Sequence, residues 1–323
     1  MTDSEPPIGP GRRAAKRWID RGLLVIGVGL LIFVVSRYSL DDIADACAIV
    51  GPAFALTLVV AFGWTLVNTR ALQLLLDNAV GFRALLAIRL IGDGYNSLLP
   101  AAGVGGEPFK VRQLTASVPV GHAVTALIRD RVIENGVGLL VTAGGLAWGL
   151  LCFALPSALR AGLVTYIAIG AAAGLASLAL VLTPLPGKLG RTLGRWLGGT
   201  GEIEHVPLPA GRLAHLLLWY ALSRFVGMFE FVALLWGLGL PHDPATVVFC
   251  YCFHHAAGFI SFAIPAGLGV FEGTTVYLFS LLGFPGPLGV ACAFARRGRM
   301  VVFGVLGAAL HVFEIRSRAR DPR

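Results

Sequence analysis

Charged residues are scarce in this chain. Only 14% of its 323 residues are Asp, Glu, Lys or Arg, against roughly 25% in an ordinary soluble domain, whereas 56% are hydrophobic. Several apolar runs approach the roughly 20 residues with which an α-helix crosses the hydrocarbon core of a bilayer. The composition therefore excludes a soluble globule and predicts an all-α protein that crosses a membrane several times.

Cysteine is also sparse, and its pattern excludes a disulfide framework. The five cysteines form an odd count, and four of them lie in or beside apolar runs. Cys250 and Cys252 precede His254 and His255, but in consecutive helical turns these four side chains point in different directions. We interpret them as core residues and expect no metal site and no cofactor.

Motifs of known catalytic and nucleotide-binding sites are missing from the sequence. It contains no Gly-x-Ser-x-Gly, no His-Glu-x-x-His, no Asp-x-Asp and no ATP-binding motif. No nucleic-acid motif accompanies the net charge of +8, which we assign to cytoplasmic loops and to contacts with anionic lipid headgroups. We therefore expect neither an enzyme nor a nucleic-acid partner.

Apolar runs predict six membrane crossings, which put both termini on one side. The basic segments 1–21, 184–212 and 314–323 then lie in the cytoplasm, and the acidic loop 37–51 lies outside, as expected for a multi-pass protein of the inner membrane. We interpret 184–212 as a linker. The predicted crossings are 22–38, 52–70, 126–155, 161–183, 213–239 and 287–313.

Two further apolar segments, 84–116 and 246–284, are interrupted by glycine and proline. The sixteen residues from Ala84 to Leu99 span about 24 Å as a helix, which is less than the roughly 30 Å of a bilayer core. We interpret both segments as re-entrant, broken helical hairpins, and the first arm of the second as nearly long enough to span. The predicted break residues are Pro100, Gly103, Gly105, Gly106, Pro265, Gly267 and Gly269.

The two hairpins belong to an internal repeat. A shift of 165 residues superposes Pro100 on Pro265, Glu107 on Glu272 and Arg131 on Arg296. Each half, 22–155 and 161–313, then has three crossings and one hairpin, so the second half is inverted relative to the first. Many transporters have this organisation. The alternative is that the glycine and proline kinks only permit tight helix packing.

Ionisable residues inside these apolar segments are costly, by about 2.5–3.5 kcal/mol each on insertion scales, and are functional candidates. Arg89 and Asp93 share a helix face, and cations outnumber anions in the interior as a whole. Guanidinium groups match phosphate oxygens, so we predict a headgroup-phosphate site made of Lys110, Arg112, Arg131, Arg296 and Arg297. The supporting carboxylates are Glu107, Glu134 and Glu272.

We predict that Glu107 pairs with Arg131 and that Glu272 pairs with Arg296. Capping of a helix first turn is the alternative for the two carboxylates, and interfacial or internal salt bridges are the alternative for the arginines.

The run from Asn96 to Glu107, the Arg129-Asp130-Arg131 segment and the run from Pro265 to Gly273 followed by Arg296-Arg297-Gly298-Arg299 resemble one known family. It is the lysylphosphatidylglycerol synthase transmembrane family, and the similarity extends roughly from residue 15 to 315. The second signature looks most like the branch associated with hopanoid biosynthesis. Members often have a larger residue than Gly106 before the first glutamate, so the identity of the lipid is not carried over.

The resemblance implies movement of a lipid, or of a lipid-linked anion, between leaflets. Two-domain members add a soluble domain that transfers an amino acid from charged tRNA to phosphatidylglycerol, and we do not expect that reaction here. We predict a flippase-like translocase of an anionic phospholipid or a polyprenyl-phosphate lipid. A lipid-modifying membrane enzyme and a scaffold for hopanoid or cell-envelope lipid synthesis remain alternatives, and a homo-oligomer is left open.

Overall fold

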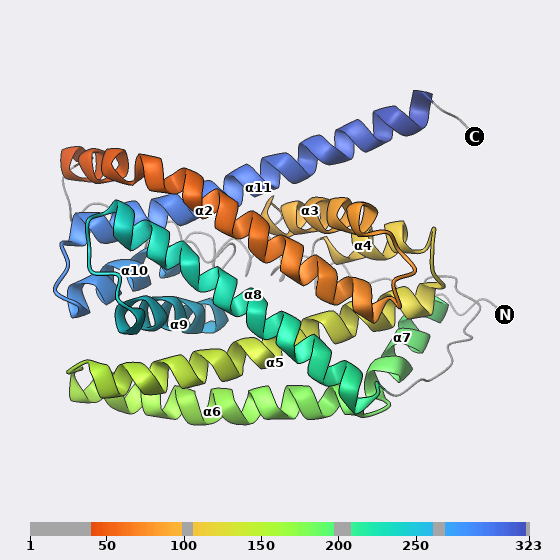
Figure 1. Cartoon of the computed structure of the whole chain (residues 1–323), viewed down its shortest axis with the longest axis horizontal. Coiled ribbons are helices and arrows are strands. Elements are labelled where there is room, and N and C mark those ends of the chain that lie inside the picture. The colour runs from red at the N-terminus through yellow and green to blue at the C-terminus, as the bar shows by residue number, and fades with distance from the viewer. Residues whose placement is uncertain (1–39, 99–105, 197–207, 261–268, 321–323) are drawn as a thin grey trace, which may run out of the picture.

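The computed structural model describes residues 40–98, 106–196, 208–260 and 269–320, and the regular elements in these ranges are α-helices. Five long helices run roughly along the longest axis of the molecule (Figure 1). They are α2 (Leu40–Leu75), α5 (Val120–Cys152), α6 (Ser157–Leu182), α8 (Ala210–Gly237) and α11 (Gly286–Arg320).

Four predicted crossings coincide with helices that are long and apolar enough to span a membrane, namely Cys47–Leu75, Val120–Cys152, Ser157–Leu182 and Gly211–Gly237. The predicted crossing 22–38 lies outside the described residues. The predicted crossing 287–313 lies within α11, whose 35 residues reach about 52 Å. Three arginines interrupt the apolar run of α11, so composition alone does not identify it as a span.

Prolines set the starts of three long helices. Pro119, Pro156 and Pro209 are the N-cap residues of α5, α6 and α8, with extended ψ angles of 141–143°. A proline at this position needs no backbone donor, and helical geometry begins directly after it. The helices start three to six residues before the predicted spans, since the apolar runs on which those predictions rest omit the more polar first turns.

The outward faces of the long helices are apolar. Val59 of α2, Leu151 of α5, Ile169 of α6 and Leu218 of α8 are each more than half exposed. Large exposed apolar side chains on several neighbouring helices are unfavourable in water and suit contact with lipid tails. The composition and these faces together support an integral, multi-pass membrane protein.

Two helical hairpins lie among the long helices, as predicted. The first consists of α3 (Phe82–Leu98) and α4 (Glu107–Leu114), and the second of α9 (Pro244–Ile260) and α10 (Val270–Leu281). Both α3 and α9 have 17 described residues, about 25 Å, and the residues that follow them, 99–105 and 261–268, lie outside the described ranges. The hairpins enter from opposite ends of the molecule, and α3 and α9 both end near its middle (Figure 1).

The predicted break residues fall into two groups. Pro100, Gly103, Gly105, Pro265 and Gly267 lie outside the described residues, whereas Gly106 and Gly269 immediately precede α4 and α10.

Glycine is needed at Gly106 and Gly269 for different reasons. At Gly106 the backbone is ordinary, with φ −90°, but a Cβ atom would collide with the backbone of Gly92 on α3. The N–H of Gly106 also donates to the Asn96 side chain at 2.7 Å, which fixes the two arms together. At Gly269 the reason is conformational, since its φ of +75° suits glycine.

Helices of the first half of the chain are in direct contact with helices of the second half. A Cβ atom on Gly307 of α11 would lie 2.6 Å from the carbonyl oxygen of Leu90 and 3.1 Å from Cα of Gly94, so α11 and α3 meet backbone to backbone. Helix α2 likewise packs against α8. Small residues allow such close approach between membrane helices.

The segment 184–212 is not simply a linker, because it contains helix α7 (Leu185–Trp196). Leu185 and Leu189 lie four residues apart on one face and are about half exposed, and Lys188 and Arg191 supply charge. The small residue Gly190 packs against Thr125 of α5. This pattern is typical of an amphipathic helix at a membrane interface. The proline and glycine content of the segment had predicted a linker instead.

Candidate functional site

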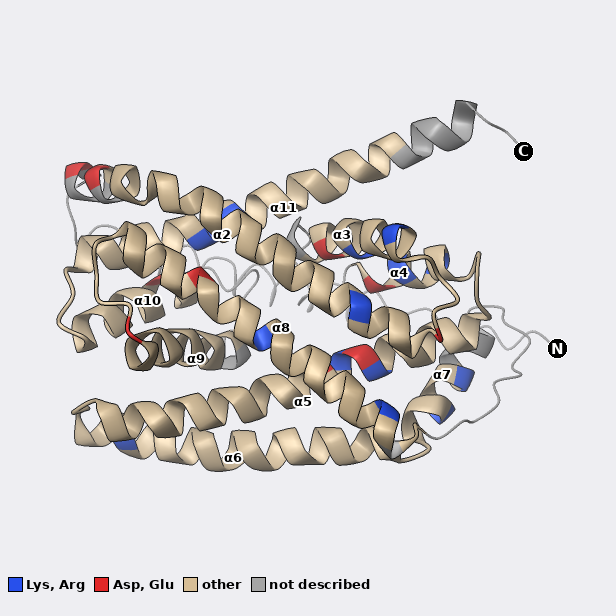
Figure 2. Cartoon of the chain, in the orientation of Figure 1, with Lys and Arg blue, Asp and Glu red and all other residues tan. Residues whose placement is uncertain are grey.

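Two apolar cores fill the ends of the molecule and leave charged residues between them. One core includes Leu72 and Leu75 of α2 and Leu85 of α3, and the other includes Phe231 of α8 and Phe249 of α9. Figure 2 shows acidic and basic residues on the hairpins and on the long-helix segments beside them. We describe the charges as two clusters, one for each hairpin.

The first-hairpin cluster contains seven side chains from three helices. Four-residue spacing puts Arg89 and Asp93 on one face of α3, and three-residue spacing does the same for Glu107 and Lys110 on α4. Helix α5 contributes Asp130, Arg131 and Glu134. Lys110 is only 2% exposed, and Arg89 and Asp130 only 1%.

Short ion pairs match most of these charges. The ammonium group of Lys110 lies 2.6 Å from Asp93 and 3.1 Å from Glu107. Arg131 lies 2.6 Å from Glu107 and 3.1 Å from Glu134. The predicted pair of Glu107 and Arg131 is therefore confirmed, and Glu107 holds two cations in addition to its position in the first turn of α4. Lys110 and Arg131 each contact two carboxylates at 3.1 Å or less.

Arg89 lies at the centre of this cluster, although the sequence did not single it out as a site residue. Its guanidinium is 3.5 Å from Asp130, 3.7 Å from Asp93 and 3.9 Å from Glu134, and it donates to the Asn68 carbonyl at 3.0 Å. The spacing of Arg89 and Asp93 was the available sequence signal. Their partners on α5 depend on tertiary packing.

The second-hairpin cluster corrects one predicted pair. Glu272, 1% exposed, accepts from Arg297 Nε at 2.6 Å and from the Gly269 N–H at 2.8 Å. Arg296 instead lies 3.0 Å from Glu230 of α8, and Arg299 lies 3.1 Å from the same carboxylate. The predicted pairing of Glu272 with Arg296 is therefore wrong.

The error has a simple geometric cause. Glu107 and Arg131 are 24 residues apart, whereas Glu272 and Arg297 are 25 residues apart. One additional residue turns a helix by about 100°, so a constant shift of 165 selects a side chain on the wrong face of α11. Arg296 and Arg299, three residues apart, share the face toward α8.

Arg112 does not join either cluster in the way the sequence suggested. It lies in the last turn of α4, with an exposed side chain. The predicted headgroup residues thus separate into matched cations, an exposed cation and the arginines of α11.

A cavity of about 190 Å³ lies beside these α11 arginines. Arg224, Arg296 and Arg299 line it, and Glu230 is the carboxylate in its lining. Two guanidinium groups share Glu230, and Nε of Arg224 is buried without a hydrogen-bond partner in the described part of the chain. The cavity therefore presents more positive than negative charge.

Arg224 also connects the cavity to the first-hairpin cluster. It donates to the backbone carbonyl of Glu134 at 2.9 Å and lies 4.0 Å from the carboxylate of that residue. On the other side it donates to Nε2 of His255 at 2.6 Å. Since arginine can only donate, His255 accepts with a neutral ring.

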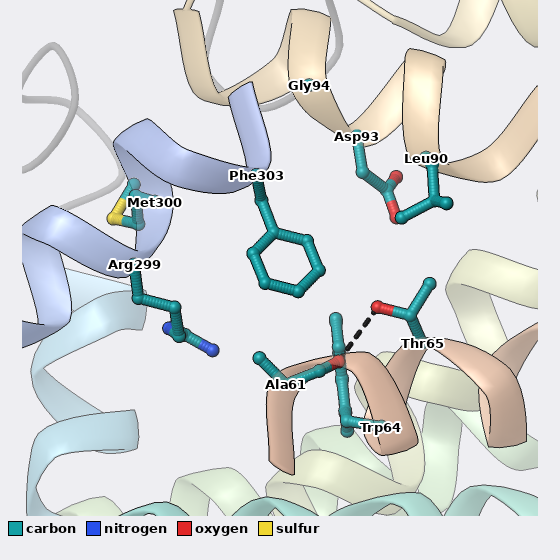
Figure 3. Close-up of a pocket in the computed structure, with 9 residues that line it drawn as sticks. All are labelled: Ala61, Trp64, Thr65, Leu90, Asp93, Gly94, Arg299, Met300 and Phe303. Carbon is teal, nitrogen blue, oxygen red and sulfur yellow. Dashed lines mark hydrogen bonds between the residues drawn. The ribbon is translucent and has the colours of Figure 1, made fainter. Parts of the chain in front are cut away.

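A second cavity, of about 110 Å³, adjoins the first and shares Ala61, Trp64 and Arg299 with it. Figure 3 shows Asp93 and Arg299 extending toward this space from opposite sides, with the ring of Phe303 between them. The two cavities bring the first-hairpin and second-hairpin clusters to one region of the interior.

The cysteine and histidine residues of α9 face different neighbours, as the helical spacing predicted. Cys250 lies in the apolar core, and Cys252 packs against Gly145 of α5. His254 stacks on Phe271 of α10. The geometry does not direct these side chains toward one point.

Comparison with known families gives one match. The family model described as Lysylphosphatidylglycerol synthase TM region matches residues 22–308. This range contains both hairpins and both charged clusters. The match concerns the family as a whole and does not distinguish a hopanoid branch. No protein of curated function matches the chain.

Proposed function

Because the chain belongs to the lysylphosphatidylglycerol synthase transmembrane family, we propose that it is a translocase that moves an anionic lipid between the leaflets of the inner membrane. The arginine-lined cavity is the observation that carries this proposal. Three guanidinium groups and one carboxylate line this partly open space between α2, α8, α9 and α11. In a dry interior such a surplus favours binding of an anion, and the planar guanidinium fork suits phosphate oxygens.

Charge matching changes which residues we propose for the headgroup. Lys110 and Arg131 already bind carboxylates, and Arg297 is held by Glu272. We therefore assign phosphate binding to Arg296 and Arg299, joined by Arg224. The shared chemistry is a lipid phosphate, whether a phospholipid or a polyprenyl phosphate carries it.

We further propose that the two halves are inverted repeats. Helices α2 to α5 and helices α8 to α11 follow the same order of a long helix, two hairpin helices and a long helix. The hairpins enter from opposite ends (Figure 1). Re-entrant hairpins with helix N-termini near the midplane are typical of transporters that bind anions there. This proposal includes α11 and 22–38 as crossings and puts both termini in the cytoplasm.

Labelling of single cysteines in a cysteine-free background tests this topology. The α4–α5 connection and helix α7 lie at one end of the bundle, and the start of α2 and the α8–α9 connection lie at the other (Figure 1). Ser117 and Lys188 belong to the first two segments, and Ala44 and His242 belong to the other two. Basic residues such as Lys188 and Arg212 favour the cytoplasm for the first end. We expect an impermeant thiol reagent added to intact cells to label cysteine at Ala44 and His242 only. Labelling at Lys188 from outside would contradict the proposed orientation.

Transport by arginine variants tests the anion site. Arg299→Lys keeps the charge but loses the fork, and loss of one charge-assisted hydrogen bond, about 1.5–3 kcal/mol, predicts at least about tenfold slower movement of phosphatidylglycerol. The measurement is leaflet-selective quenching of fluorescent phosphatidylglycerol in proteoliposomes. Arg112→Lys, an exposed change outside the cavity, is the matched control and should leave the rate unchanged.

Two outcomes would contradict the proposal. Equal rates for wild type and Arg299→Lys would remove the guanidinium from headgroup recognition. A change in lipid mass during the assay would indicate a lipid-modifying enzyme, because a translocase alters only sidedness.

A further inference from the structure

On α3, α4 and α5 the first-hairpin cluster contains one more carboxylate than cation, and Arg224 of α8, 4.0 Å from Glu134, supplies the balancing positive charge. Its cations are Arg89, Lys110 and Arg131, and its carboxylates are Asp93, Glu107, Asp130 and Glu134. Burial of an unmatched negative charge is strongly unfavourable. When an anion in the cavity engages Arg224, one carboxylate is left unmatched, and a proton on one of the four carboxylates relieves this imbalance.

Geometry distinguishes Asp130 from the other three. Asp93 lies 2.6 Å from Lys110, Glu107 lies 2.6 Å from Arg131, and Glu134 lies 3.1 Å from Arg131. The nearest cation to Asp130 is Arg89 at 3.5 Å, which Asp93 and Glu134 also share. Asp130 instead accepts a hydrogen bond from the hydroxyl of Tyr220. It is the carboxylate least matched by positive charge.

The charged and titratable groups around Asp130 come from three helices. Arg89 faces it from α3 and Tyr220 from α8, and Arg131 and Glu134 follow it on α5.

The polar groups beside this site are incompletely paired. Asn68 of α2 is fully buried, and both polar atoms of its side chain lack hydrogen-bond partners among the described residues, as does Nε of Arg89. Since buried polar groups are normally satisfied, the cluster is not a closed salt-bridge network.

We propose that Asp130 is a proton-binding site and that a proton and the anionic lipid bind together. This inference rests on the proposed function. A proton from water would add to a carboxylate oxygen of Asp130, while the other oxygen continues to accept from Tyr220. One negative headgroup and one positive proton then enter the interior, so its net charge is the same in the empty and the loaded protein.

Arg224 provides the coupling between the two sites. It lines the anion cavity and also contacts Glu134, one helical turn after Asp130. An anion that engages Arg224 reduces the positive potential that this residue supplies to the acidic cluster, which favours proton binding there. By thermodynamic reciprocity, protonation strengthens anion binding to the same degree.

Thermal stability in detergent tests the proton site without any transport. The folded protein binds this proton more tightly than the unfolded chain does, and phosphatidylglycerol strengthens the binding. Wild-type stability in the presence of this lipid should therefore fall as the pH rises above about 4, the ordinary pKa of an Asp side chain in an unfolded chain. Asp130→Asn imitates the protonated side chain and should flatten this pH dependence with little loss of stability at neutral pH. Asp45→Asn, the same change at an exposed carboxylate of α2 outside the cluster, is the matched control and should leave the pH dependence of the melting temperature unchanged. An unchanged slope in Asp130→Asn would overturn the proposal.

Proteoliposomes that contain fluorescent phosphatidylglycerol test the coupling. In wild type, a pH gradient should accelerate lipid movement toward one leaflet and slow it when reversed, whereas Asp130→Asn should move lipid at a rate insensitive to the gradient. Equal responses in both proteins, or a wild type that ignores the gradient, would overturn coupling. If wild type moves no lipid, the proposed function and the coupling both fail, and the stability measurement still decides whether Asp130 binds a proton.

Discussion

Glu272→Gln should destabilise the protein by about 3 kcal/mol, because it leaves the buried end of Arg297 without its counter-charge. Glu272 is 1% exposed and accepts two contacts from Arg297, at 2.6 and 3.4 Å, as well as the N–H of Gly269. The Glu272 side chain therefore connects the first turn of α10 to α11. The measurement is the melting temperature of the purified protein in detergent.

A double-mutant cycle separates pairing from simple helix capping. Glu272→Gln combined with Arg297→Gln should be milder than the sum of the two single changes, with a coupling of about 2 kcal/mol. The matched control is the same cycle with Arg296, the residue before Arg297. Since Arg296 binds Glu230, a cycle of Glu272→Gln with Arg296→Gln should be additive within about 0.5 kcal/mol. Coupling to Arg296 instead of Arg297 would refute the observed pairing.

The equivalent change in the first half should be weaker. After Glu107→Gln, Lys110 retains Asp93 at 2.6 Å and Arg131 retains Glu134 at 3.1 Å. Because each cation keeps a partner, we expect a loss of about 1 kcal/mol, similar to that of a helix cap. Both hairpins therefore contain a glutamate–arginine ion pair, but we expect the pair in the second hairpin to contribute more to the free energy of unfolding.

Gly106→Ala is the second change with a large expected effect. The added methyl group would meet the carbonyl oxygen and carbonyl carbon of Gly92, which are backbone atoms that cannot rotate away. We expect a loss of about 3 kcal/mol, at the upper end of overpacking effects, because the arms of the first hairpin must separate. That separation would also move Lys110 relative to Asp93, so lipid movement should fall together with the melting temperature.

Gly144→Ala is the control for this substitution. Gly144 lies in the middle of α5, is exposed, and has no atom within 4 Å of an added Cβ. Alanine favours helix over glycine by about 1 kcal/mol, so the control should be neutral or stabilising. If Gly106→Ala behaves like Gly144→Ala, then the arms of the hairpin are not held in backbone contact.

Sequence patterns predicted the helical elements better than the contacts between them. Apolar runs located α2, α5, α6 and α8, and the glycine and proline interruptions located both hairpins. Helix α7 was missed because its apolar residues recur every four positions instead of forming a run. Prolines such as Pro119 and Pro209 predict helix starts more accurately than hydropathy does, since they act on backbone geometry and not on composition.

Partners of the charged residues were harder to predict than the helices. The pairing of Glu107 with Arg131 followed from the predicted repeat, but the same shift failed for Arg296, because one additional residue changes the face of a helix. Arg224 and Tyr220 escaped prediction for another reason. Each meets α5 about 90 residues away in sequence, and no periodicity of α8 indicates which of its faces meets α5.

The contact between Gly94 and Gly307 also determines when the first half of the protein can finish folding. These glycines are 213 residues apart in the sequence (307 − 94), and the ribosome adds roughly 5–20 residues per second, so α3 is synthesised about 10–40 s before the part of α11 that packs on it. During this time the face of α3 that carries Leu90 and Gly94 has to be covered by lipid, by the insertion machinery or by another neighbour. The contact between α3 and α11 therefore cannot form until α11 has been synthesised.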